Sequence, residues 1–384
     1  MDTRVCILTS RHRFDDARIY HKEVKTLLNA GYKISIMASD KGHEPSRVGV
    51  KVRLYRKWRF FRFLTSVFSL VKLGMSEQAD IYHCHEGDSS LTAGVIIKGL
   101  FALRGKEVRL IYDAHEVLAY TFYDSMNRML RTPVTWFVFF YEYWLVKFAD
   151  AVITANDIVK SYFQLFHPDM PVIRLYNVPK LSLFQKSSQP KQAKEFQFCH
   201  EGGITFNRGI KPLFEAFITL AHLHDNWNFL FIGGPRNDKV EAYIKKMFTT
   251  HPKLEDYVTI TGWLPYEEVG EHLGRCEVGC IFLEPTRNNM LGGPPNKLFN
   301  YMRYGMPVIA PAYPEIERII TDHNCGILLE KITSESITSV MKGIIKNEYD
   351  LASLGQSGQK VGISQYNWEA EQEKLLRLYD ELSQ

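Results

Sequence analysis

Short apolar runs separated by helix-length segments recur along this chain, and that alternation restricts its fold more than any other feature. In the first half the runs read "RVCILTS", "YKISIMAS", "VKVRLYR", "ADIYHCHE", "VRLIYDAHE", "ADAVITAN" and "PVIRLYNV". Apolar runs of this length that alternate with helical segments are typical of buried parallel strands in β-α units. The pattern therefore predicts an α/β fold with parallel sheets.

The alternation is interrupted once and then restarts. The interruption, "PKLSLFQKSSQPKQAKE", is polar and lysine-rich and contains two prolines, which predicts a linker at 179–194. After it come "FQFCHEGG", "WNFLFIGG", "YVTITGW", "VGCIFLEP", "MPVIAPA" and "CGILLE". We therefore expect two doubly wound, Rossmann-like domains at 1–178 and 195–365, and a last helix at 366–384 that returns to the first domain. Ligands bind beyond the carboxyl ends of parallel strands, so we expect the active site in a central cleft that the two sheets face.

The composition is that of an ordinary globular chain. Of the 384 residues, 45% are hydrophobic and 23% are charged, so neither disorder nor a coiled coil is indicated. A net charge of +4 indicates no nucleic-acid partner, although it is compatible with anionic ligands. The six cysteines include no C-x-x-C pair, which favours buried free thiols in a reducing compartment. We expect a cytoplasmic protein, because the first apolar run, Val5 to Leu8, is too short for a signal peptide.

Two aromatic segments bear on the question of a membrane. "TWFVFFYEYWLVKFA" (Thr135 to Ala149) is interrupted by Glu142 and Lys147 and falls short of the about 18 to 20 apolar residues that span a bilayer. We predict a buried helix there. "RKWRFFRFLTSVFSLVKLG" (Arg56 to Gly74) mixes cations with aromatic and aliphatic residues and could lie on an anionic leaflet. A helix that packs on the sheet with its basic residues outward would show the same pattern.

The loops after the strands of the second half could hold a nucleotide. Two of them contain paired glycines that let backbone N–H groups approach a phosphate: Gly202, Gly203, Gly233 and Gly234. Arg208, in "HEGGITFNRGI", could bind the same phosphate through two N–H groups. A strand-to-helix turn with a solvated arginine is the alternative. Trp263 and Leu264 follow another strand and could hold a nucleobase, unless Trp263 packs in the core.

The stretch "PPNKLFNYMRYGMPVIA" predicts a helix that starts near Pro295 and is followed by a buried strand. Proline fits the first turn of a helix, where no N–H is needed. The helix start carries a partial positive charge and Lys297 adds a full one, so an anion is favoured beside Asn296. The alternative is a Pro-Pro cap with a lysine in water.

These motifs resemble, in order and spacing, those of the retaining glycosyltransferases of family 4 (glycosyltransferase group 1), which have the GT-B fold. Nearly the whole chain is covered. In the second half the resemblance rests on Gly202 with Arg208-Gly209, "FIGG", "ITGWLPYEEV" and "PPNKLFNYMRYGMPVIAP". In the first half it rests on "FDDARIYHKEVKTLLNAGYKISIMA", "DIYHCHE", "LIYDAHE" and "ADAVITAN". It implies a GT-B arrangement of two Rossmann-like domains facing a central cleft.

The resemblance implies an activity: a sugar passes from a nucleotide diphosphate sugar to a hydroxyl of a saccharide or lipid-linked acceptor, with retained anomeric configuration, in cell-surface polysaccharide or glycolipid synthesis. Negative charge grows on the leaving diphosphate, so Arg208 and Lys297 are the expected catalytic cations. The leaving phosphate can take the acceptor proton itself, so no protein base is required. Domain closure is expected, as is a peripheral position on the inner face of the cell membrane. The expected donor-binding residues are Gly202, Gly203, Gly233, Gly234, Trp263, Leu264, Pro295, Asn296 and Asn300.

His115, in "YDAHE", matches the family histidine that lies near the reacting sugar, and it is the third expected catalytic residue. A structural, hydrogen-bonding histidine is the alternative. Glu116 follows it in the matching context, on the acceptor side. The first loop, "RFDDARIY", lacks the glycine pair that many members carry, so Asp16 and Arg18 are expected to touch the acceptor or the domain interface.

No cofactor and no metal ion are expected beside the nucleotide sugar. His83, His85 and Glu86 in "YHCHEGD" could be read as metal ligands, since residues 83 and 85 share one face of a strand. No Asp-x-Asp pair for a divalent cation occurs in the sequence, however. We therefore predict a metal-independent site.

Three positions depart from the family pattern and keep other functions open. Gly203 replaces an arginine that often follows the first glycine, which removes one cation. Gly292 and Asn300 align with two glutamates that are separated by seven residues. Asn300 could bond a sugar or ribose hydroxyl without charge, but it could equally mark an inactive enzyme. A catalytically silent GT-B scaffold subunit and a nucleotide-sugar epimerase are the alternatives; a dehydrogenase is disfavoured because no G-x-G-x-x-G follows the first strand.

Overall fold

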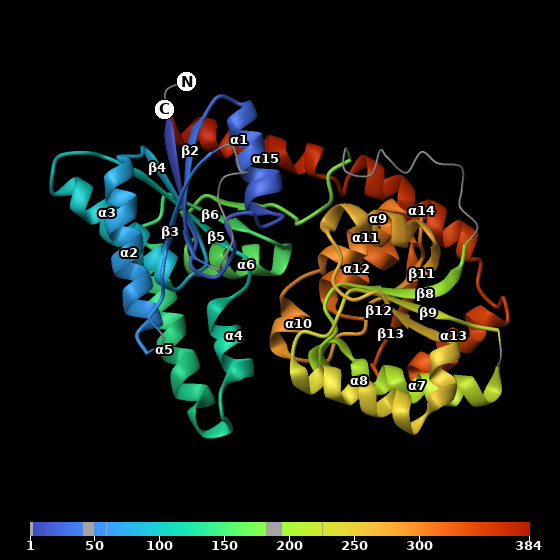
Figure 1. Cartoon of the computed structure of the whole chain (residues 1–384). Helices are drawn as coiled ribbons and strands as arrows, with labels where there is room; N and C mark the ends of the chain where they lie inside the picture. Colours follow the sequence, from blue (N-terminus) through green and yellow to red (C-terminus); the bar gives the residue numbers. More distant parts are fainter. Residues whose placement is uncertain (1–2, 41–49, 59, 182–193, 225) are drawn as a thin grey trace. The chain divides into compact units, whose positions relative to one another are not determined.

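The computed structural model (Figure 1) describes residues 3–40, 50–58, 60–181, 194–224 and 226–384. These residues form two compact α/β units, and each has its own sheet.

The chain enters the first unit twice. That unit takes Met1–Asn177 and Glu369–Gln384, and the second unit takes Val178–Trp368. The last helix therefore belongs to the first unit. Within the linker predicted at 179–194, residues 182–193 lie outside the described part of the chain. A cleft between the two sheets stays a prediction.

The described residues of the first unit form a seven-stranded parallel sheet in the order β3-β2-β1-β4-β5-β6-β7. The strand order reverses between β1 and β4, so the carboxyl ends of these two neighbours form the switch point where α/β folds bind ligands. The strands are β1 (Arg4–Leu8), β2 (Lys33–Ser39), β3 (Lys51–Tyr55), β4 (Ile81–His85), β5 (Arg109–Ala114), β6 (Ala151–Thr154) and β7 (Val172–Arg174).

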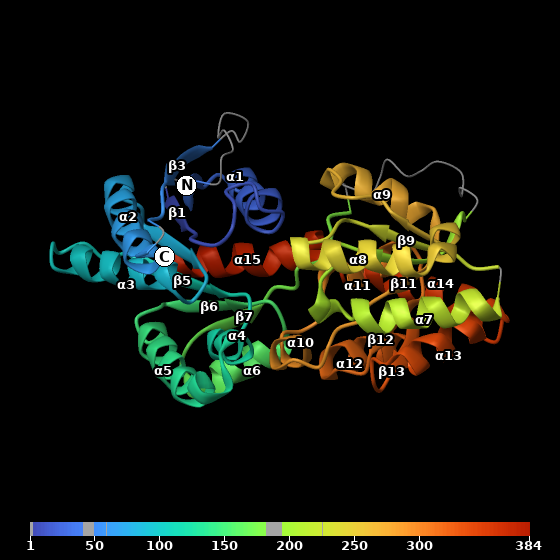
Figure 2. The same ribbon diagram turned by 60° about the horizontal axis from the view of Figure 1, so that its bottom comes forward.

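Helices cover both faces of this sheet, which explains why its strands read as continuous apolar runs. Figures 1 and 2 both show α2 and α3 on one side and α1 and α15 on the other. Two hydrogen bonds tie α15 down, from Thr26 Oγ1 to Gln372 at 3.2 Å and from Tyr32 Oη to Asp380 at 3.0 Å. The helices are the π-helix η1 (Ile19–Val24), α1 (Lys25–Asn29), α2 (Arg62–Glu77), α3 (Ser89–Ala102), α4 (Leu118–Ser125), α5 (Arg128–Val146), α6 (Asp157–Phe166) and α15 (Trp368–Leu382).

The second unit repeats this plan. Its described part holds a six-stranded parallel sheet in the order β10-β9-β8-β11-β12-β13, with the reversal between β8 and β11. Its strands are β8 (Phe196–Glu201), β9 (Phe229–Ile232), β10 (Val258–Ile260), β11 (Cys276–Cys280), β12 (Val308–Pro311) and β13 (Gly326–Leu329). Its helices are η4 (Phe206–Arg208), α7 (Ile210–Leu223), α8 (Asp238–Thr250), η5 (Pro252–Asp256), α9 (Tyr266–Gly274), α10 (Arg287–Leu291), α11 (Asn296–Arg303), α12 (Pro314–His323), α13 (Ser334–Ile345) and α14 (Leu351–Ser364).

Local sequence explains where several helices begin. The Asn156 side chain accepts a hydrogen bond from the Val159 N–H at 2.8 Å at the start of α6, and Asn237 caps α8 in the same way. Thr333 and Ser336 form a capping box at the start of α13. The predicted state of the cysteines is confirmed, because all six are buried and free.

The prediction of a buried helix at 135–149 is wrong. Most of this stretch lies in α5, and only every fourth residue of that helix is buried: Val138, Glu142 and Val146. Five aromatic side chains in and just after this helix are more than half exposed: Trp136, Phe137, Phe140, Trp144 and Phe148. In the described residues, no helix combines the length and the apolar character that crossing a bilayer requires.

Candidate active site

Two glycine loops meet at the carboxyl ends of β8 and β9. Gly202 follows β8 with φ +95°, and Gly233 follows β9 with φ +142°. A Cβ on Gly233 would lie 2.5 Å from the carbonyl oxygen of Gly202, so the two backbones can approach only because this residue is glycine. The loops therefore present backbone groups without side chains at the edge of the sheet.

An exposed tryptophan lies beside these loops. Trp263 is 59% exposed, so the alternative prediction that it packs in the core is wrong. Its indole ring lies over Gly203 and Gly234, where added Cβ atoms would come within 2.9 Å and 3.1 Å of it. The Arg236 guanidinium lies 5.7 Å from the ring centroid. Leu264, next in sequence, is half-buried. A flat aromatic surface with a cation beside it could hold a nucleobase.

Two basic side chains, Lys297 and Arg208, come close together near the end of β8. Lys297 lies in the first turn of α11, is buried, and contacts His200 through Nζ and Nε2 at 2.9 Å. Burial, and next the charge of Arg208, lower the pKa of Lys297 well below its usual value. Arg208 itself donates from Nη1 to the Gly203 carbonyl at 2.9 Å. The alternative of a lysine in water is therefore wrong, and Pro295 with the exposed Asn296 forms the helix start as predicted.

Asn300 is buried against a carboxylate that the sequence reasoning missed. Its Nδ2 donates to both oxygens of Glu201, at 2.8 Å and 2.9 Å. Tyr301 Oη accepts from the Glu201 backbone N–H at 2.8 Å, so two neighbouring side chains of α11 hold the end of β8. Gly292 leaves no room for the family glutamate, because a Cβ there would lie 2.2 Å from the Asn288 carbonyl oxygen. The carboxylate of this region thus comes from β8.

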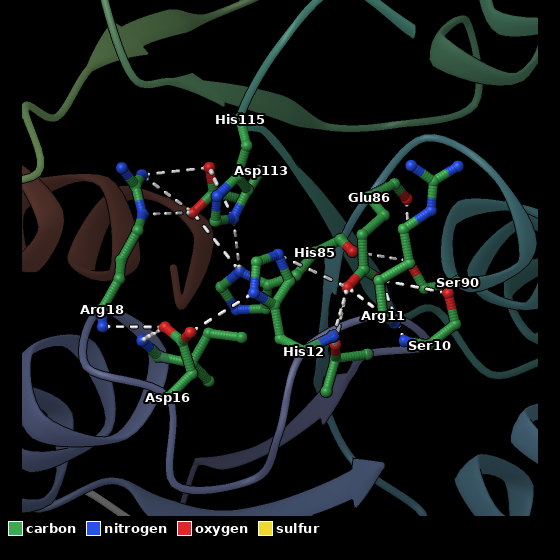
Figure 3. A network of polar contacts seen from close by, with 12 residues as sticks. Ser10, Arg11, His12, Asp16, Arg18, His85, Glu86, Ser90, Asp113 and His115 are labelled. Atoms are coloured by element: carbon green, nitrogen blue, oxygen red, sulfur yellow. Dashed lines mark hydrogen bonds and ion pairs between the residues drawn. The ribbon is translucent and has the colours of Figure 1, made fainter. Parts of the chain in front are cut away.

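The first unit has a polar network at its own switch point, between β1 and β4. The Glu86 carboxylate accepts from Thr9 Oγ1 at 2.7 Å and from the backbone N–H groups of Ser10, Arg11 and His12 at 2.9 to 3.2 Å. Glu86 has φ +94°, a strained conformation for a residue with a side chain. Figure 3 shows His85 and His12 between this carboxylate and the Arg18–Asp113 pair. The buried Glu86 carboxylate therefore fixes the loop after β1 by accepting hydrogen bonds from four consecutive residues.

His115 lies where β5 ends, at the edge of this network. Its ring stacks on His12 with centroids 4.8 Å apart, and its Nε2 lies 3.3 Å from His85 Nδ1. Burial lowers the pKa of His115 to about 3, although the Asp113 carboxylate opposes the shift. The side chain still has 23% of its surface exposed, and Glu116 beside it is half-buried. His115 is therefore a neutral imidazole with one accessible edge.

Arg18 is buried among partners from the first unit, and its contact with the acceptor or the domain interface stays a prediction. It is 2% exposed, and its guanidinium donates to Asp113 at 2.9 to 3.2 Å, to Glu23 at 2.8 Å and to the Leu175 carbonyl at 3.1 Å. Asp16 accepts from the backbone N–H groups that follow it and contacts His12 Nδ1 at 3.3 Å. Burial alone would raise the pKa of Asp16, but these partners outweigh it and the pKa is lowered. Asp16 shapes the loop that carries His12.

Two family models match the chain in succession. Residues 17–177 match "Glycosyltransferase Family 4", and residues 183–361 match "Glycosyl transferases group 1". The chain belongs to the group 1, family 4 glycosyltransferases. The predicted fold, two doubly wound Rossmann-like domains of GT-B type, is confirmed.

Solved structures of the same fold extend over this whole glycosyltransferase. Sucrose-phosphate synthase from Thermosynechococcus elongatus is similar at 15% identity and a TM-score of 0.73, with 99% of each chain covered. Anabaena HepE, solved with UDP-glucose, is similar at 13% identity and 0.73, with 98% of this chain and 99% of that one covered. WaaG, a glycosyltransferase involved in lipopolysaccharide biosynthesis, gives 14% and 0.71 over 97% and 98%. A sequence comparison with curated proteins gives no significant match.

A metal ion does not fit the buried histidines of this glycosyltransferase. Potential ligand atoms of Glu23, His83, His85 and Asp113 lie within 4.8 Å of one another. However, Arg18 already pairs with both carboxylates. A divalent cation would therefore leave the fully buried cluster with a net positive charge, which is costly. Glu86, the third ligand considered from the sequence, is outside this group and binds the loop after β1.

The sequence held a weak signal for some of the partners that were missed. His200 and Glu201 directly precede Gly202 at the end of a predicted strand, so their place at the sheet edge could have been inferred. Asp113 stands two residues before His115. Glu23 lies in η1, inside the stretch "FDDARIYHKEVKTLLNAGYKISIMA", but nothing in that stretch singles it out as a partner of Arg18 and Asp113.

Proposed function

We propose that this glycosyltransferase moves a hexose from a uridine diphosphate sugar to a saccharide or lipid-linked acceptor, with retention of configuration, in polysaccharide or glycolipid synthesis. The observation that carries the proposal is the close placement of two cations, Lys297 and Arg208, at the end of β8. The structures of HepE with UDP and with UDP-glucose support the donor class. The role of WaaG in lipopolysaccharide biosynthesis supports the acceptor class.

The electrostatics of the second unit favour an anionic ligand. Burial of Lys297, and next the charge of Arg208, lower the pKa of Lys297. A bound diphosphate opposes this shift, so the same two groups gain most where negative charge grows on the leaving phosphate. These cations take the place of a metal ion in the proposed reaction.

His115 has the character of a hydrogen-bond partner rather than an acid. With its pKa lowered to about 3, the ring is neutral at physiological pH. We propose that it donates to a hydroxyl of the transferred sugar. The acceptor proton goes to the leaving phosphate oxygen, which departs on the same face, so configuration is retained without a protein base.

Calorimetric binding of UDP, GDP and ADP to the full chain without metal tests this proposal. UDP should bind best, and Lys297→Met should weaken it at least about 10-fold, as expected when one charge-assisted contact is lost. Lys245→Ala is the matched control, because Lys245 is an exposed lysine of the same unit paired with Glu241. A bound diphosphate favours the charged form of Lys297, so the affinity for UDP should fall more steeply with rising pH in wild type than in Lys297→Met.

Two other outcomes would redirect the assignment. If no nucleoside diphosphate binds, the silent-scaffold alternative replaces the transferase. If UDP binds and the purified protein interconverts UDP-sugars without an acceptor, the epimerase replaces it. Retention is read from the anomeric coupling constant of the product.

We also propose that the first unit docks on an anionic bilayer through the outward faces of α2 and α5. The two helices meet where the Phe63 and Tyr141 rings lie 6.4 Å apart. Large apolar side chains stand exposed on and beside them: Trp58, Phe60, Phe61, Phe63, Leu64, Phe68, Met129, Leu130, Trp136, Phe137, Phe140, Trp144 and Phe148. An exposed apolar patch of this size indicates a surface that binds a protein partner or a membrane.

The charges around this surface favour a lipid partner of negative charge. The same two helices and the segments beside them also carry cations: Lys57, Arg62, Lys72, Arg128, Arg131 and Lys147. The acidic residues of the two helices do not oppose them, because Glu142 is buried and Glu77, at the end of α2, pairs with Lys51 and Arg53. Each Lys or Arg near an anionic surface contributes about 1 kcal/mol. Arg59, within the predicted segment, lies outside the described residues.

Flotation with liposomes that contain phosphatidylglycerol tests the docking surface. The wild-type chain should float at about 100 mM salt, where charges a Debye length apart still interact. Trp136→Ser with Phe140→Ser, which removes a stacked aromatic pair, should lower the bound fraction severalfold. Leu223→Ser, an exposed leucine of the second unit, should leave it unchanged. Equal binding to neutral phosphatidylcholine, or no binding by wild type, would rule the surface out.

A further inference from the structure

In the buried polar cluster of the first unit, two hydrogen-bonding atoms face each other, and one of them must carry the hydrogen between them. Glu23 Oε2 and His85 Nε2 are both buried without a hydrogen-bond partner, and they lie 3.5 Å apart. Two bare lone pairs in contact inside a protein would cost free energy twice, once for each unsatisfied atom. One proton between them removes both penalties, so the question is which atom holds it.

The other nitrogen of His85 decides the question. Its Nδ1 lies 3.5 Å from Asp113 Oδ2 and 3.3 Å from His115 Nε2 (Figure 3). Asp113 is ionised, because Arg18 donates to both of its oxygens. A bare lone pair on Nδ1 would face that carboxylate, whereas an N–H on Nδ1 is attracted to Asp113 and can donate to His115.

With the hydrogen on Nδ1, the neutral His85 ring has its lone pair on Nε2. The hydrogen between His85 and Glu23 must then belong to the Glu23 carboxyl group. Two charged groups act on Glu23. Burial and the ionised Asp113 raise the pKa of Glu23 and favour a proton on it, while the Arg18 Nε–H needs only the other oxygen, Oε1, at 2.8 Å. His83 on the same strand face contacts Tyr379 Oη through Nδ1 at 2.8 Å, while its Nε2 has no hydrogen-bond partner and lies 3.8 Å from Asp113 Oδ2.

We infer that Glu23 and His85 are positioning residues that fix the tautomer of His115. A hydrogen-bond relay connects the three residues: the Glu23 carboxyl group donates to His85 Nε2, and His85 Nδ1–H donates to His115 Nε2. His115 Nε2 is thereby made an acceptor, and Nδ1 carries the ring hydrogen. A neutral histidine in this tautomer offers one fixed donor at its accessible edge. The effect on turnover rests on the proposed role of His115 in sugar transfer, whereas the tautomer itself does not.

Nitrogen NMR of the full chain labelled with [15N]histidine reads the tautomer directly. His115 should show a protonated Nδ1 and a bare Nε2, assigned by comparison with His115→Gln. In His85→Asn the amide nitrogen takes about the place of Nδ1 and can still donate, so the pattern should persist. In His85→Gln the amide sits at the Nε2 end instead, and the His115 signals should change to the Nε2–H form or a mixture. An Nε2–H form in wild type would overturn the inference.

Thermal unfolding tests the proton on Glu23 separately. Glu23→Gln keeps the shape, donates an N–H to His85 Nε2 and accepts from Arg18, so its Tm should stay within about 3 °C of wild type. Asp113→Asn removes the ionised partner of Arg18 and should lower Tm by at least about 6 °C. If Glu23→Gln is as damaging as Asp113→Asn, Glu23 is an ionised carboxylate and the relay is wrong.

Turnover then separates this inference from the proposed function. His85→Gln should lower kcat about 10- to 100-fold, the value of one well-placed hydrogen bond in the transition state, and leave the donor KM within about twofold. His85→Asn should recover most of kcat. If the tautomer changes as expected but kcat does not, the relay stands and the role of His115 at the sugar falls. If the nucleotide does not bind at all, the proposed function fails and the NMR result is unaffected.

Discussion

A buried carboxyl group in α5 makes the stability of this glycosyltransferase depend on pH in a way that one substitution should remove. Glu142 is 1% exposed, on the face of α5 that packs inward, and Tyr112 Oη donates to its Oε1 at 2.7 Å. Its other oxygen has no partner. Burial raises the pKa of Glu142 from 4.5 to about 7. The folded chain therefore keeps the proton up to near neutral pH, whereas the unfolded chain loses it near 4.5.

The sign and size of the effect follow from these two values. Between pH 4.5 and 7 the folded state binds more protons than the unfolded state, so stability falls as pH rises through that window. At about 1.4 kcal/mol per unit of pKa, the difference between 4.5 and about 7 amounts to about 3 kcal/mol, lost in full above pH 7. Glutamine cannot ionise. Glu142→Gln should therefore gain, relative to wild type, about 1 kcal/mol at pH 5 and about 3 kcal/mol at pH 8.

Urea unfolding of both proteins at pH 5 and pH 8, followed by fluorescence, measures this difference. Any cost of the amide group itself is the same at both pH values, so it cancels when the two mutant-minus-wild-type differences are subtracted. The expected remainder is about 2 kcal/mol. Glu241→Gln, an exposed residue of α8, should show no such remainder. A remainder near zero, or a larger gain at pH 5 than at pH 8, would show that Glu142 is ionised in the folded state.

Two further substitutions address the second unit. Asn300→Glu puts a second carboxylate against Glu201 and should lower the free energy of unfolding by about 2 to 4 kcal/mol. The double variant Asn300→Glu with Glu201→Gln removes that repulsion and should recover the lost stability, as measured by thermal melts of both variants. Equal melting of the single and double variants would argue against the pair. Gly233→Ala should cost about 1 to 3 kcal/mol and weaken UDP binding, because its φ is +142° and its Cβ would lie 2.5 Å from the Gly202 oxygen. Gly274→Ala in α9, where a Cβ meets nothing within 4 Å, is the control and should be neutral or stabilising.

The sheets could be predicted from the sequence because parallel strands buried on both faces leave a direct record. Each quoted apolar run overlaps a strand, and each strand end then places the following residues at the sheet edge. That is how Gly202 and Gly233 were located without knowledge of their partners, whereas His115 was identified through the family resemblance. Inferences from strand ends need only the direction of the strand and the position of its last residue.

The error at α5 has a physical explanation in the same kind of pattern. A stretch dense in aromatic residues and interrupted by one acid was read as a core helix with a tolerated charge. The structure reverses the two roles: Glu142 points inward to Tyr112, while Trp136, Phe137 and Trp144 point outward. Composition shows how apolar a helix is, but it does not show which face of the helix packs against the rest of the fold. An acid can occupy the buried side if a hydroxyl donates to it and its pKa is raised.

Partners were harder to predict than positions, since they come from distant parts of the chain. Arg18 pairs with Asp113 across 95 residues and Asn300 with Glu201 across 99. Arg18 was expected at the acceptor or the domain interface and Asn300 at the donor, and in the structure each holds another side chain at the end of a strand. This changes where specificity should be sought. At the end of β8 the hydrogen-bond acceptors are the carboxylate oxygens of Glu201, so changing Asn300 should affect a ligand only by moving that carboxylate. A ribose-selectivity screen should therefore vary position 201 first and treat position 300 as its support.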